Sequence, residues 1–231
     1  MNATAIAAIG AIAFGLIAIL ALLPAATAIP ARLDAQWSRD VQAHLQRSDE
    51  NQNTNYSYSI KQKVLLVAVA AAVGYGVVWK YGAATQGLAF GFYFIGLTLI
   101  VAINLKHYLL PDVVVLSILW AGLLFQAFSG NASASIYGAL VGYLVPFLIG
   151  LAFKMKTRAE VIGQGDCKTL SMAGAWFGVE SMPIVFGAFV VGLILWVILT
   201  KLAGPKSQRY IATGAAHLVA SLVAAFGTTT F

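Results

Sequence analysis

The sequence is poor in cysteine, histidine and charged side chains. Its 231 residues include one Cys and three His, and 10% of them are charged. A single Cys excludes a disulfide framework, and three scattered His argue against a conventional zinc cluster. Typical soluble domains are about half apolar and about a quarter charged, whereas 60% of this chain is hydrophobic and its mean hydropathy is +0.85. This composition excludes an ordinary soluble globular protein and a disordered chain.

The sequence instead contains long apolar runs. A helix needs about 20 predominantly apolar residues to cross a bilayer core. We predict membrane segments at 3–29, 64–82, 87–105, 112–129, 135–153, 167–178, 181–200 and 208–227. The sixth is short, so it is either tilted or begins at or below the membrane surface. The first segment resembles a signal peptide, because residues 24–28 are similar to a cleavage site. No basic residue precedes its long apolar stretch, however, and we interpret it as a retained helix. The predicted fold is an all-α, polytopic membrane bundle with about eight transmembrane segments, forming a single domain over 1–231.

The basic residues indicate the orientation of these segments. Of the 14 Lys and Arg residues, all but Lys80 lie in the loop 30–63 or at the connections that follow the third, fifth and seventh segments. The positive-inside rule makes this side cytoplasmic and places both termini outside. The basic residues then act as topological anchors, some with anionic lipid contacts, and we predict no nucleic-acid partner. The loop 30–63 is the only sizeable soluble segment, and it is too short to be a domain of its own.

Two acidic residues lie at membrane boundaries. Asp112 and Asp166 each stand at the expected cytoplasmic start of a helix. An ionisable group at the edge of an apolar segment is a functional candidate, whereas the simpler alternative is that each Asp caps its helix. Gly163 and Gly165 precede Asp166, and Gly residues permit close backbone approach and positive φ, which can present a carboxylate to a cleft. Pro111, directly before Asp112, is expected to end one helix and start the next.

Two sequence blocks together resemble a known family. The blocks are Ile103 to Leu124, which includes Leu-Pro-Asp and Leu-Trp-Ala-Gly-Leu-Leu, and Gly163 to Gly178, which begins Gly-Gln-Gly-Asp-Cys-Lys. They resemble the bacterial type IV prepilin peptidases, which are polytopic aspartic proteases of the Gly-x-Gly-Asp class. The resemblance implies cleavage of the basic leader from prepilins at the cytoplasmic boundary of the inner membrane, with both termini periplasmic. It also implies two carboxylates that share a proton, as acid and base.

Position 104 departs from the family pattern. Asp166 matches the second catalytic Asp, but Asn104 stands where the family has the first. Asn is nearly isosteric with Asp and cannot act as a base. Three explanations stay open: an engineered Asp-to-Asn change that inactivates the enzyme, replacement of the missing acid by Asp112, or a natural pseudoenzyme. The otherwise intact motif favours the first.

Other features of the family are missing or ambiguous here. The loop 30–63 lacks the Cys-x-x-Cys pairs that bind zinc in larger relatives, so we predict no metal and a minimal form of the enzyme. Proteolysis then needs no cofactor, and S-adenosylmethionine is expected only if the methyltransferase activity is retained. Lys168 either keeps Asp166 ionised or extends to the lipid headgroups. Cys167 is interpreted as a small core residue and not as a nucleophile.

The leading hypothesis is therefore a prepilin leader peptidase whose partners are the prepilin substrate and membrane lipids. The alternatives are a non-catalytic pilus-assembly or prepilin-holding subunit, which Asn104 favours, and a transporter. A transporter usually shows repeated halves or broken helices near the middle of the membrane. We find no such repeat, and the two candidate acids lie at the boundary instead.

Overall fold

The computed structural model describes residues 3–45, 57–82, 84–158, 162–202 and 212–227, and of 37–45 it describes the backbone alone. All regular structure in these ranges is helical, which confirms the all-α class. By length and composition, five helical stretches of the described residues are long and apolar enough to cross a membrane. The chain is therefore a multi-pass membrane protein. These stretches are Thr4–Gln36, α3 (Ile60–Tyr81), α4 (Thr85–His107), α6 (Ala132–Thr157) and Val179–Leu202, which includes α8 (Met182–Leu202).

The first helix continues beyond the predicted membrane segment. α1 (Ala3–Ile17) passes through a π-helical turn (Ala18–Leu22) into α2 (Leu23–Leu45), which contains Pro30. Residues 30–45 of the predicted cytoplasmic loop are therefore helical. The residues after Pro30 include Ala, Leu, Arg and Gln, which are good helix formers, and charged residues do not by themselves end a helix. A proline removes only one backbone hydrogen bond here. Residues 46–56 of that loop lie outside the described ranges.

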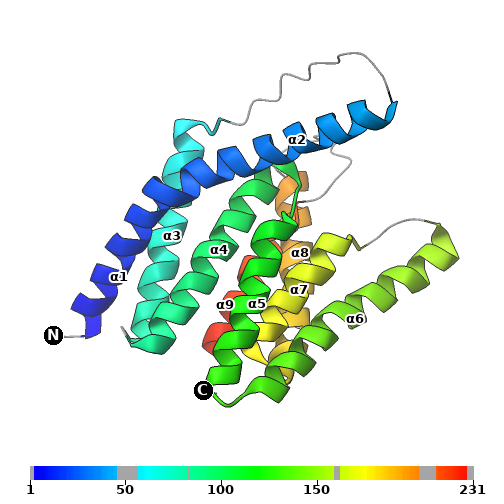
Figure 1. Cartoon of the computed structure of the whole chain (residues 1–231). Helices are drawn as coiled ribbons and strands as arrows, with labels where there is room; N and C mark the ends of the chain where they lie inside the picture. The colour runs from blue at the N-terminus through cyan, green and yellow to red at the C-terminus, as the bar shows by residue number, and fades with distance from the viewer. Residues whose placement is uncertain (1–2, 46–56, 83, 159–161, 203–211, 228–231) are drawn as a thin grey trace. The chain divides into compact units, whose positions relative to one another are not determined.

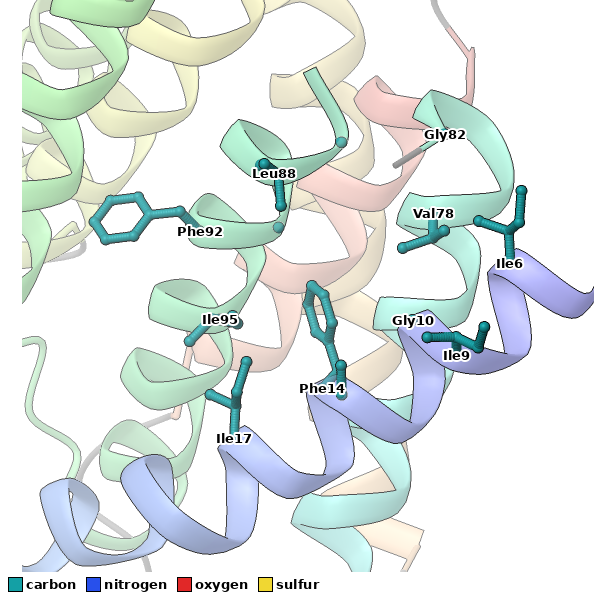
Figure 2. Close-up of a pocket in the computed structure, with 13 residues that line it drawn as sticks. Ile6, Ile9, Gly10, Phe14, Ile17, Val78, Gly82, Leu88, Phe92 and Ile95 are labelled. Atoms are coloured by element: carbon teal, nitrogen blue, oxygen red, sulfur yellow. The ribbon is translucent and has the colours of Figure 1, made fainter. Parts of the chain in front are cut away.

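Contacts divide the chain into two compact units, residues 1–99 and 100–231, with the boundary inside α4. That the whole chain forms one membrane domain stays a prediction. In the first unit, α1 packs along α3, and a cavity of about 590 Å³ opens among α1, α3 and α4 (Figure 2). Its lining is entirely apolar and includes Ile6, Phe14, Val78 and Phe92. This lining offers no acid, base or nucleophile. The candidate residues Asn104, Asp112 and Asp166 all lie in the second unit.

The centre of the second unit is α7 (Gln164–Phe177), which packs against α5 (Asp112–Phe128), α6, α8 and α9 (Gly214–Gly227) (Figure 1). With 14 residues it is about 21 Å long, shorter than a bilayer core. Its last carbonyl groups accept hydrogen bonds from the side chains of Gln126 (2.6 Å), Ser135 (2.6 Å) and Ser181 (2.8 Å). These donors satisfy carbonyls that a helix end otherwise leaves unpaired, so α7 can end inside the protein.

Glycines allow α7 to lie against α6. A Cβ atom at Gly138 would collide with the backbone of Gly174, and one at Gly174 would collide with that of Gly138. Gly142 is similarly close to the backbone of Leu170. Small residues at a helix interface let the two backbones approach each other closely. This packing holds α7 rigidly, and therefore also the acid in its first turn.

Candidate active site

Asp166 lies in the first turn of α7, three residues after the N-cap residue Gly163. Its carboxylate accepts a hydrogen bond from the Gly163 backbone, so Asp166 does help to cap α7, as the simpler interpretation held. Gly163 has φ −75° and ψ 149° and Gly165 is helical, so the expectation of positive φ at this motif is wrong. Close approach does hold, because a Cβ atom at Gly165 would lie 3.1 Å from the side chain of Leu110.

The carboxylate of Asp166 also meets α9. Its Oδ1 atom lies 3.0 Å from Nε2 of His217, and the two side chains are 14% and 2% exposed. The imidazole ring also packs against Phe189 of α8, with ring centroids 4.5 Å apart. The side chain of Thr213, just before α9, supplies a further hydrogen bond to Asp166. One carboxylate thus has donors from its own helix and from the start of α9.

These donors favour the ionised form of Asp166. Burial alone would raise the pKa of this carboxyl group, because it disfavours the charged form. The hydrogen bond and charge of His217, and then the hydrogen bonds from Thr213 and Gly163, lower the pKa below its usual value of 3.8. The adjacent Cys167 is buried, as expected of a core residue.

Asn104 approaches the same end of α9 from α4. Its side chain is buried, and its Oδ1 accepts a hydrogen bond of 2.7 Å from the backbone N–H of Gly214, the first residue of α9. A Cβ atom at Gly214 would lie 3.1 Å from Asn104 and from the backbone of Val101, so this contact requires glycine. Positions 104 and 166, which are 62 residues apart in sequence, therefore converge on the five residues from Thr213 to His217.

Asp112 has a different environment. It is the first residue of α5, after the N-cap residue Pro111, so the expected break at this proline is confirmed. Its carboxylate is 54% exposed and lies 2.6 Å from Nζ of Lys168. Lys168 thus pairs with Asp112 and not with Asp166, contrary to one of the two expectations. Residues two apart on a helix do not face each other, so Lys168 and Asp112 lie on another face of α7 from the Asp166–His217 contact.

Sequence reasoning missed the start of α9. The segment 208–227 was treated as an apolar span, and His217 was not singled out as a partner of either Asp. The sequence did mark His217 as a candidate, because an ionisable residue inside an apolar helix is a functional candidate. Neither Thr213 nor Gly214 carried a comparable signal, since their importance depends on which helices lie beside them.

Comparison with known proteins shows that the middle of the chain is similar to one family. Residues 91–198 match the model of the Type IV leader peptidase family. This match confirms the resemblance drawn from the two blocks, both of which lie inside the matched range. The first turn of α9 lies outside it. No solved structure matches this chain.

Several curated relatives carry the name "Prepilin leader peptidase/N-methyltransferase". The protein of Stutzerimonas stutzeri is 35% identical over 151 residues, and that of Pseudomonas aeruginosa is 36% identical over 151 residues; each alignment covers 64% of this chain and 52% of the relative. The Aeromonas hydrophila protein is 44% identical over 102 residues, 40% of this chain and 35% of its own length. The chain thus spans about half the length of the first two of these curated relatives and about a third of the other.

Proposed function

We propose that this chain, whose residues 91–198 match the type IV leader peptidase family, is a prepilin leader peptidase. Its site consists of Asp166 and the side chain at position 104. The substrate is the basic leader of a prepilin together with the start of the hydrophobic helix that follows. Cleavage takes place at the cytoplasmic boundary of the bacterial inner membrane, with the prepilin and membrane lipids as partners.

The observation that carries this proposal is the convergence of positions 104 and 166 on one helix turn. Asn104 binds the first N–H of α9, and Asp166 binds His217 three residues further along. Three residues correspond to about one turn and a rise of about 4.5 Å, so the two side chains contact neighbouring points of one short segment. Asp112, exposed and paired with Lys168, shares neither contact.

The chemistry needs one group that accepts a proton from water and another that polarises the peptide carbonyl. The donors around Asp166 favour its charged form, which is the form that accepts a proton. With Oδ1 of Asn104 bound to Gly214, the amide Nδ2 group is the part of this side chain that can still donate to a carbonyl oxygen. An amide cannot transfer a proton as a carboxylic acid does, so the chain as it stands lacks the second titrating group of the dyad.

Several further statements belong to the same proposal. Proteolysis by two carboxylates uses no metal or cofactor, and S-adenosylmethionine would be needed only if this chain also methylates the new amino terminus. The cytoplasmic orientation is supported by the basic residues in the last turns of α4, α6 and α8, which include Lys106, Lys156 and Lys201.

Asn104 supports a second candidate function. A chain that binds prepilins at this site but lacks the first carboxyl group would hold the substrate without cutting it. This candidate keeps the same fold, substrate class and membrane location. It differs from the first in a single respect, which is whether any natural form of the chain has an acid at position 104.

A cleavage assay with purified protein and a model prepilin tests both functions. It compares the chain as it stands with Asn104→Asp, each with and without Asp166→Ala. We expect cleavage by the Asn104→Asp form alone, and its loss when Asp166→Ala is added. Cleavage by the unaltered chain would move the dyad to Asp112 and Asp166. Tight prepilin binding with no cleavage by any variant would favour the holding function.

A further inference from the structure

The first turn of α9 lies beyond the residues that match the family model, yet it contacts both positions of the proposed dyad. His217 is 2% exposed and lies in a helix that is otherwise apolar apart from Ser221. A histidine buried in this way needs a polar partner, and its Nε2 atom has one in Oδ1 of Asp166, at 3.0 Å. The contact joins α9 to α7 across 51 residues of sequence.

We propose that His217 is a positioning residue of the peptidase, which binds Oδ1 of Asp166 and thereby directs Oδ2 toward water and the scissile peptide. This inference rests on the proposed function, because it assigns His217 a role in that reaction. His217 does not itself meet the substrate. Its imidazole is enclosed by Asp166 and the ring of Phe189, so it acts through the carboxylate.

The surroundings of Oδ2, the second carboxylate oxygen of Asp166, support different roles for the two oxygens. A Cβ atom at Gly163 would lie 3.4 Å from Oδ2 of Asp166, and Gly163 is an exposed residue. The absence of a side chain there leaves space beside Oδ2 on the side open to solvent. Oδ1, by contrast, faces a buried ring. His217 thus binds Oδ1, whereas the space left by the missing side chain at Gly163 lies beside Oδ2.

The first turn of α9 also positions the side chain at 104, through the backbone of Gly214. Its N–H holds the side chain at position 104 at 2.7 Å, while His217 holds Asp166. Because both contacts come from one rigid helix turn, the turn sets how the two side chains face each other. Small displacements of a reacting group are costly in catalysis, with about 100-fold lost for about 1 Å.

The groups that face Asp166 determine how its protonation depends on pH. They are His217 and Thr213 from the start of α9, the Gly163 backbone and the Cys167 thiol from α7. Lys168 is engaged by Asp112 instead. Of these groups, His217 contributes the largest effect that favours the charged carboxylate. Its removal should therefore move protonation of Asp166 to higher pH.

The test is made in the Asn104→Asp form, with His217→Leu, His217→Gln and Phe189→Leu. We expect His217→Leu to lower kcat about 100-fold, to leave KM nearly unchanged, and to move the acidic limb of the pH–rate profile to higher pH. Gln can still donate to Oδ1, so His217→Gln should recover most of kcat. Phe189→Leu removes the ring contact alone and should stay within about threefold of the parent.

A readout that needs no activity uses the chain as it stands, labelled with ¹⁵N-histidine in detergent micelles. Of its three His, the one whose signals disappear in His217→Gln should move when Asp166→Asn is introduced. Unmoved signals, or an unchanged pH profile for His217→Leu, would overturn the inference. An Asn104→Asp form that cuts no prepilin would reject the proposed function and, with it, this role. In that case the NMR shift would still report whether the contact itself exists.

Discussion

Gly163→Ala tests whether Oδ2 of Asp166 is the oxygen that meets the attacking water, and it should affect catalysis much more than stability. The new methyl group would lie 3.4 Å from Oδ2, in the space that we expect the water to enter. Alanine adopts φ −75° and ψ 149° without strain. It gains about 0.4–1 kcal/mol from a less flexible unfolded chain and loses a comparable amount because it is a poorer N-cap residue than glycine. The net change in the free energy of unfolding should therefore stay within about 0.5 kcal/mol.

Activity should change much more. Displacing water from Oδ2 by about 1 Å should lower kcat/KM of the Asn104→Asp form about 100-fold, which corresponds to about 2.7 kcal/mol of transition-state stabilisation. Prepilin cleavage rates and thermal unfolding in detergent, measured on the same samples, compare the two effects. Gly165→Ala is the matched control, because its methyl group meets Leu110 and not the carboxylate. Cleavage by Gly163→Ala at the parental rate would show that Oδ2 is not the oxygen that meets water.

Two further changes test the rest of the site and its support. Asp112→Asn in the Asn104→Asp form should leave cleavage near the parental rate and cost less than about 1 kcal/mol of stability, because the exposed pair with Lys168 is weak; loss of cleavage in this assay would make Asp112 the second acid. Gly138→Ala should destabilise the protein by about 3 kcal/mol in thermal unfolding, because its methyl group meets the backbone of Gly174. Gly187→Ala, where nothing lies within 4 Å, should stabilise the exposed helix position by about 1 kcal/mol, and equal effects of both changes would contradict the packing argument.

The helices were largely predictable because hydropathy is a local property. Each of the eight apolar segments overlaps a helix of the described chain, and the break at Pro111 falls where the sequence placed it. The beginning of the first loop was not predictable in this way. The residues after Pro30 favour a helix, and α2 continues to Leu45. Polar residues indicate where a segment can leave the membrane, but they do not indicate where its helix ends.

The partners of the acids were not predictable, because they depend on which helix ends come together. Lys168 is two residues from Asp166 in sequence, yet it reaches Asp112 on α5. The partner of Asp166 comes from α9, 51 residues away. Close spacing in sequence suggested the first pairing, and helix geometry excluded it, because residues two apart point to different faces.

The sequence by itself determined the all-helical membrane class, the family resemblance of the middle segment, and the two acids that stand at helix starts. These follow from composition and from short motifs, in which neighbouring residues carry the information. Only the tertiary structure decided that positions 104 and 166 share the first turn of α9 and that Asp112 does not. The physical reason is that the contacts of Gly214 and His217 arise from packing among α4, α7 and α9, whose relative placement no local stretch of sequence encodes.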